Sequence, residues 1–156
     1  MAKEIMRRGA SDNAYLHKDF HGALSVGLEF LHNRYGEEAV REYLRRFADS
    51  FYTPLRESLK KSGLSALRDH YEKIYRLEGG VATFVLSDGE LIIEVPESPA
   101  VAHMRQNGYT VARLFHETVK TVNETICEGT DYGFELQSYD PATGGSRQRF
   151  FRRAAK

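Results

Sequence analysis

The chain has 156 residues, of which 41% are hydrophobic and 12% aromatic, and this composition suits a single domain over residues 1–156. Lys plus Arg and Asp plus Glu both total 22, so no net basic charge attracts the chain to nucleic acid or to an anionic membrane. The single cysteine, Cys127, excludes an internal disulfide and a zinc site held by thiolates. We therefore expect a soluble, cytoplasmic domain with no nucleic-acid or membrane partner and with flexible ends at residues 1–12 and 153–156.

Helical patterns fill the first half of the chain. Apolar residues recur at helical spacing from Ala14 to Asn33, and Tyr35 and Gly36 end this pattern. A second helix starts near Glu37, whose carboxylate favours the positive end of a helix dipole. Further along the first half of the chain, a proline and several glycines divide the helical pattern into shorter helices. The sequence therefore predicts further helices over residues 54–63 and 64–78.

The second half contains two strand pairs and two helices. VATFVLS and ELIIEV flank a turn at residues 87–89 and predict a β-hairpin. Two helices follow, a short one over AVAHMRQNG and a long one from Val111 to Cys127. The segments YGFELQSYD and RQRFFRR predict a second hairpin, and we expect its arginines to protect an exposed sheet edge. The sequence thus predicts an α+β fold, in which a helical N-terminal half packs on a mostly antiparallel sheet of about four strands. The two hairpins are joined by a long helix.

Three of the six histidines lie in one stretch, HKDFHGALSVGLEFLHNRYG. His17 and His21 are one helical turn apart, which is the spacing at which two imidazoles can bind one metal or one anionic group. His32 lies about 16 Å further along the helix and cannot join them. The Glu that metalloproteases need after the first histidine is replaced by Lys18, which excludes that class. His17 and His21 thus remain candidates for a metal site, a metal-free polar site or ordinary structural histidines.

Other candidate residues lie on the first hairpin, on or just after the short helix, and at the end of the long helix. His103 follows two prolines at a junction where irregular backbone can form a pocket wall, although a surface position explains it equally well. Glu94 lies among aliphatic residues on a predicted strand and is a candidate for binding the substrate or for acid–base chemistry, although the solvent face of an edge strand explains it as well. Arg105 and Tyr109 are candidates for binding a substrate near His103. Cys127 has no histidine within reach on its own helix, so a structural thiol is the favoured interpretation.

Three segments of the chain carry a family resemblance: HGALSVGLEFLHNRYGEEAVREYL, SPAVAHMRQNG and YGFELQSYDPATGGSRQRFF. Together they resemble the small bacterial and archaeal L-2-amino-thiazoline-4-carboxylic acid hydrolase-like proteins, over about Leu16 to Phe151. The chain departs from that family at Ser98 and at Asp131, near which the family favours cysteine. The resemblance implies that activated water opens a C–N bond in a small heterocycle.

Two classes of function follow from these observations. The first is a hydrolase of a small heterocyclic carboxylic acid, in which His17 or His21 is the general base and His103 or an arginine holds the substrate. It predicts a closed polar pocket between the first helix and the sheet, and it needs no cofactor unless His17 and His21 bind a divalent metal. The alternative is a non-enzymatic domain that binds a small molecule, for which nine Tyr and nine Phe are available, or that binds a partner protein or a second copy of itself.

Overall fold

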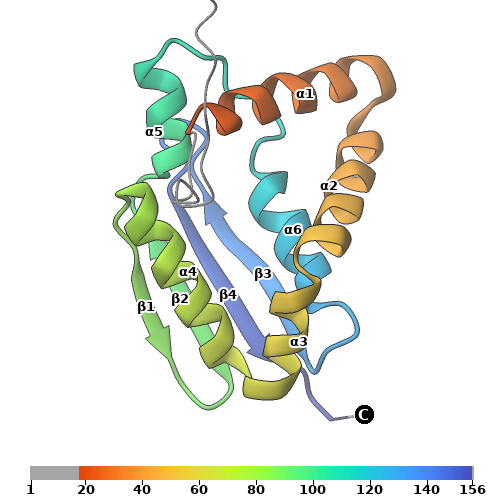
Figure 1. Cartoon of the computed structure of the whole chain (residues 1–156), viewed down its shortest axis with the longest axis vertical. Coiled ribbons are helices and arrows are strands. Elements are labelled where there is room, and N and C mark those ends of the chain that lie inside the picture. The colour runs from red at the N-terminus through yellow and green to blue at the C-terminus, as the bar shows by residue number, and fades with distance from the viewer. Residues whose placement is uncertain (1–17, 156) are drawn as a thin grey trace, which may run out of the picture.

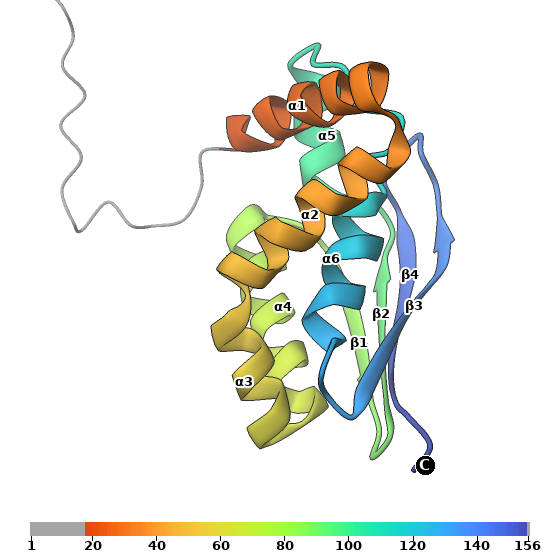
Figure 2. The same cartoon turned by 90° about the vertical axis from the view of Figure 1, so that its right-hand side faces the viewer.

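The computed structural model describes residues 18–155 and contains six helices and one four-stranded sheet in that part of the chain. Four helices come first, and a hairpin, two helices and a second hairpin follow (Figure 1). The helices gather on one side of the sheet, with the first helix lying across one end of it (Figure 2). The predicted α+β fold is therefore confirmed.

The four N-terminal helices follow the predicted order, and the glycines lie at their boundaries. Gly36 separates the first two helices, and Gly63 separates the third from the fourth. Gly79 ends the fourth helix in the left-handed conformation, with φ of 70°, that side chains other than glycine rarely adopt. No helix in residues 18–155 combines the length and the apolar character needed to span a bilayer. The helices are α1 (Asp19–Tyr35), α2 (Glu37–Phe51), α3 (Thr53–Ser62), α4 (Leu64–Glu78), α5 (Pro99–Gln106) and α6 (Glu117–Cys127).

The sheet is fully antiparallel and has the strand order β1-β2-β4-β3. Helix α4 packs over β1 and β2, and α6 packs over β3. Side chains alternate between the two faces of each strand, so Leu91, Ile93 and Phe150 point into the core and are fully buried. The strands are β1 (Thr83–Leu86), β2 (Glu90–Val95), β3 (Tyr132–Tyr139) and β4 (Ser146–Arg152).

The arginine-rich strand occupies a different place from the one predicted. Strand β4 pairs with β2 on one side and with β3 on the other, so it is an inner strand and protects no edge. Two of its arginines, Arg147 and Arg149, point to the face of the sheet away from the core. There Arg147 pairs with Glu94, and Arg149 pairs with Glu90 and Glu135 on the neighbouring strands. The alternation of arginine with buried residues therefore reflects cross-strand ion pairs on an exposed face.

The long helix predicted from Val111 is shorter than expected, because α6 begins only at Glu117. Two side chains of α1 account for this difference. The amide of Ala112 donates to the Ser25 hydroxyl at 2.7 Å, and the amide of Arg113 donates to a Glu29 carboxylate oxygen at 3.0 Å. These bonds hold residues 110–113 against α1, and turns follow before α6 begins. The apolar periodicity of this segment serves packing without a regular helix.

Candidate functional site

The predicted residue His21 forms a contact between α1 and the end of α4. Its Nε2 atom lies 3.2 Å from a carboxylate oxygen of Glu78, whose side chain is only 7% exposed. A carboxylate at one ring nitrogen holds the imidazole in a fixed orientation and leaves Nδ1 as the proton acceptor when Nε2 carries the hydrogen. Glu78 thus positions His21, a partner that the helical wheel of α1 alone does not predict.

The predicted residue His103 forms a second histidine–carboxylate pair a short distance away. Its Nε2 atom lies 3.0 Å from a carboxylate oxygen of Asp19, at the start of α1. The hydroxyl of Tyr109 donates to the same oxygen at 3.3 Å, and the Tyr109 ring packs so closely on Gly22 that a Cβ there would lie 2.8 Å from it. Three predicted site residues, His21, His103 and Tyr109, are therefore gathered around the first turns of α1.

A pocket of about 520 Å³ lies beside both pairs, between the start of α1, the end of α4 and α5. Glu78 and His103 line it together with Lys18, Glu97 and apolar side chains. The sequence predicted a closed pocket between the first helix and the sheet. The first helix packs against α2 and α5 instead, so the observed pocket lies in a different place. Within residues 18–155 no group of three or more His, Cys, Asp or Glu side chains is arranged to hold a metal ion.

The remaining predicted residues are scattered. Glu94 is about half exposed on the outer face of the sheet and pairs with Arg147, and Arg105 donates to the carbonyl of Pro141 at 3.0 Å. His32 is on α1, and its Nδ1 atom is buried with no hydrogen-bond partner in the described part of the chain. His17 lies outside the described residues.

The side chain of Cys127 is completely buried at the end of α6. Burial raises its pKa to about 12. A nucleophilic cysteine needs a lowered pKa and access to solvent, so this environment is that of a structural residue.

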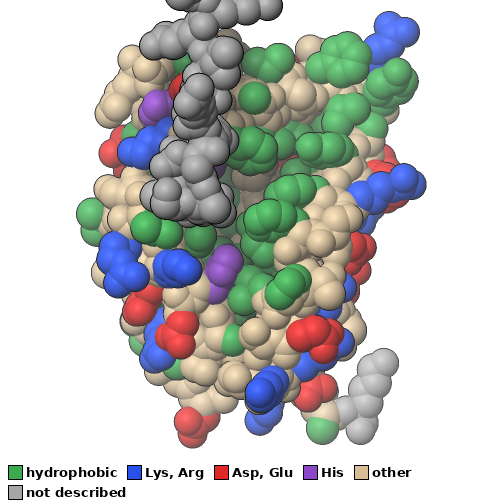
Figure 3. All heavy atoms as spheres, viewed as in Figure 1, with side chains coloured by type: hydrophobic (Ala, Val, Ile, Leu, Met, Phe, Trp, Pro, Cys, Tyr) green, Lys and Arg blue, Asp and Glu red, His purple; other side chains and the backbone are tan. Residues whose placement is uncertain are grey.

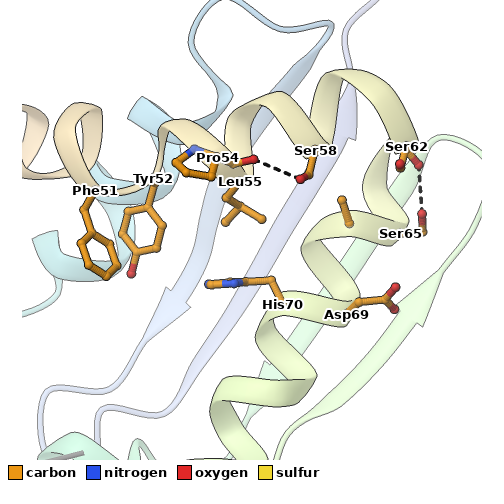
Figure 4. Close-up of a pocket in the computed structure, with 10 residues that line it drawn as sticks. Phe51, Tyr52, Pro54, Leu55, Ser58, Ser62, Ser65, Asp69 and His70 are labelled. Atoms are coloured by element: carbon orange, nitrogen blue, oxygen red, sulfur yellow. Dashed lines mark hydrogen bonds between the residues drawn. The ribbon is translucent and has the colours of Figure 1, made fainter. Parts of the chain in front are cut away.

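A second concave region, which the sequence did not predict, lies between α3 and α4 (Figure 4). We call it the α3–α4 groove. It has a volume of about 570 Å³ and opens on the helical face, where hydrophobic side chains gather between α4 and α2 (Figure 3). Its lining residues are Phe51, Tyr52, Pro54, Leu55, Ser58, Ser62, Ser65, Ala66, Asp69 and His70.

Small residues and two helix breaks explain why this groove stays open. Pro54 lies in the first turn of α3, shortly after the end of α2, and Gly63 reverses the chain into α4, so α3 and α4 lie side by side. The side chains between them at positions 58, 62, 65 and 66 are three serines and an alanine, which are too small to fill the space. A concentration of small residues on two adjoining helices was the available sequence signal for the groove.

Two polar groups at one end of the groove form no hydrogen bond with any described residue: the hydroxyl of Tyr52 and the imidazole of His70. Their rings meet edge to face with centroids 5.9 Å apart. Burial raises the pKa of Tyr52, and the Glu78 carboxylate raises it further, so the hydroxyl keeps its proton at neutral pH. Burial, with Lys73 in second place, lowers the pKa of His70, so its imidazole is neutral. Both groups are therefore uncharged and free to bond a ligand.

No protein-family model matches this sequence, and a search of curated proteins finds no match.

Proposed function

We propose that the protein binds a small organic molecule in the α3–α4 groove. The observation that carries this proposal is the convergence of aromatic side chains with two partly buried polar groups, Tyr52 and His70, that have no hydrogen-bond partner in residues 18–155. Neither polar group is sealed from solvent, so a ligand that displaces the water there can form hydrogen bonds with both. The groove volume of about 570 Å³ falls in the range of small-molecule sites, roughly 300–1,000 Å³.

A fragment screen by protein-observed NMR tests this proposal. We expect aromatic fragments to shift the amide signals of α3 and α4, because stacking on Phe51 and Tyr52 buries apolar area. Filling the groove with the substitution Ala66→Leu should abolish these shifts. Ala23→Leu adds the same side chain at an exposed position on α1 and serves as the matched control, which should keep full binding. Shifts that survive Ala66→Leu unchanged, or a screen without hits on α3 and α4, would contradict the proposal.

The pair of His21 and Glu78 favours a second candidate function, hydrolysis of a C–N bond in a small heterocycle. Here we propose that the substrate lies in the pocket between α1, α4 and α5. The Glu78 carboxylate accepts the Nε2 hydrogen of His21, and Nδ1 takes a proton from water as the water oxygen bonds to the ring carbon. The C–N bond then breaks, and His21 returns the proton to the leaving nitrogen. The lone support for this candidate is the geometry of the pair beside a pocket.

Turnover of a panel of small cyclic amides, amidines and thiazolines distinguishes the two functions. If the second candidate is correct, His21→Gln should lower kcat by roughly 10²–10⁴-fold, which is the usual effect of removing a general base. His116→Gln removes a histidine at the start of α6, away from the pocket, and should leave kcat unchanged. Equal activity of the His21→Gln and wild-type proteins would exclude this mechanism.

A further inference from the structure

We infer that the ligand of the α3–α4 groove is an amine that carries an aromatic ring, bound with its ammonium group at the serine end of the groove and its ring at the aromatic end. This inference rests on the proposed binding function and names the chemical class of the ligand.

The two ends of the groove differ in chemistry. Figure 4 shows Phe51, Tyr52, Leu55 and His70 together at one end, whereas Ser62, Ser65 and Asp69 lie at the other. One face of the Phe51 ring stacks on Phe47, but the side chain is still 63% exposed and offers apolar area to a ligand. A ligand that satisfies both ends therefore has an apolar ring on one side and a polar group on the other.

The serine end offers hydrogen-bond acceptors. The hydroxyl of Ser58 donates to the carbonyl of Pro54 at 3.0 Å, and the hydroxyl of Ser65 donates to the carbonyl of Ser62 at 2.9 Å. Each hydroxyl has one hydrogen, and here the backbone takes it, so only oxygen lone pairs remain for a ligand. A ligand group that donates hydrogen bonds, as an ammonium group does, can bond both of these oxygens, whereas the hydroxyl of Ser62 donates to no described residue and accepts either kind of group.

The charges of the lining residues also favour an ammonium group in the ligand. Asp69 is the one ionised side chain among the ten lining residues, which include no Lys or Arg, and the imidazole of His70 is kept neutral. Arg68 donates to Oδ1 of Asp69 at 2.9 and 2.7 Å, but this pair is solvent-exposed and therefore weak. An ammonium group can share the Asp69 carboxylate with Arg68 or replace it, whereas an anionic ligand meets no cation in the lining.

Isothermal titration with three probes tests the inference: phenethylamine, hydrocinnamate and butylamine. Hydrocinnamate has a similar size and ring but a carboxylate, and butylamine has the ammonium without a ring. We expect phenethylamine to bind about three- to fivefold more tightly than hydrocinnamate, since one exposed ion pair contributes up to about 1 kcal/mol. It should also bind more tightly than butylamine, which has no ring to pack at the aromatic end. Asp69→Asn should bring the affinities of phenethylamine and hydrocinnamate within about twofold of each other. Glu72→Gln removes an exposed carboxylate of α4 outside the groove and should leave the preference unchanged.

The outcomes separate this inference from the proposed binding function. Hydrocinnamate that binds the groove as tightly as phenethylamine would overturn the ligand class while leaving the groove as a binding site. Butylamine that binds as tightly as phenethylamine would overturn the role of the aromatic end. If Ala66→Leu leaves the affinity of every probe unchanged, the groove is not the binding site and both proposals fail.

Discussion

Glu117 illustrates how a buried charge is stabilised in this protein. Its side chain is only 2% exposed, and its carboxylate accepts hydrogen bonds from Thr121 at 2.6 Å and from Arg41 at 3.1 Å. Burial acts to raise the pKa of Glu117, but the hydrogen bonds from Thr121 and Arg41 outweigh it, and the pKa lies below its ordinary value of 4.5. The carboxylate is therefore ionised in the folded protein at neutral pH and links α6 to α2.

Replacing Arg41 with methionine should lower the free energy of unfolding by about 1–3 kcal/mol at pH 7, because the Glu117 charge stays buried without its cation. A lowered pKa in the fold stabilises the protein above pH 4.5, and this contribution disappears as the pH falls through the folded pKa. The difference between the wild type and Arg41→Met should therefore shrink from pH 5 to pH 3. Urea titrations at these pH values measure it, and a constant difference would show that Glu117 is not the group responsible.

The thiol of Cys127 should be unreactive in the native protein. Its pKa of about 12 leaves almost no thiolate at pH 8, and its side chain is completely buried. Alkylation by iodoacetamide at pH 8, followed by mass spectrometry, should label the protein only in urea. Rapid labelling without denaturant would mean that the end of α6 opens far more readily than its packing implies.

At the scale of elements, side-chain hydrogen bonds connect α1 to the segment between α5 and α6. Ser25 is completely buried, and its hydroxyl donates to the carbonyl of Thr110 at 2.7 Å while accepting from the amide of Ala112. One hydroxyl thus satisfies two backbone groups of the segment between α5 and α6, and it is this contact that delays the start of α6.

Ser25→Ala should lower the free energy of unfolding by about 1–3 kcal/mol, since it leaves buried backbone groups without partners. Ser50→Ala changes an exposed serine of α2 and should alter stability by less than about 0.5 kcal/mol. Urea unfolding at pH 7 compares the two. Equal stability of the Ser25→Ala variant and the wild type would show that water replaces the lost hydroxyl.

The order of the elements could be predicted from the sequence because it depends on local signals. Gly36, Gly63 and Gly79 lie where the helices end, and the change from helical to alternating periodicity lies where the sheet begins. The start of α6 and the inner position of β4 could not be predicted, since both depend on contacts between distant residues: Ser25 with Ala112, and β4 with β2 and β3.

At the scale of the whole molecule, the candidate sites also depend on contacts between distant residues, which the sequence alone does not show. The spacing of His17 and His21 drew attention to one helix, but the partner of His21 is Glu78, 57 positions away in the sequence. The α3–α4 groove escaped prediction for a related reason. Tyr52 lies at the junction of α2 and α3, His70 lies on α4, and neither residue alone indicates a binding site. Only the turn at Gly63 brings α3 and α4 side by side.

The central claim is that a ligand occupies the space between α3 and α4, and intermolecular NOEs test it most directly. With phenethylamine at saturation, we predict NOEs from its ring protons to the methyl groups of Leu55 and from its chain protons to the methyl group of Ala66. NOEs to Val81 and Ala102 instead would place the ligand in the pocket between α1, α4 and α5. That result would contradict the account and would favour the site of His21 and Glu78.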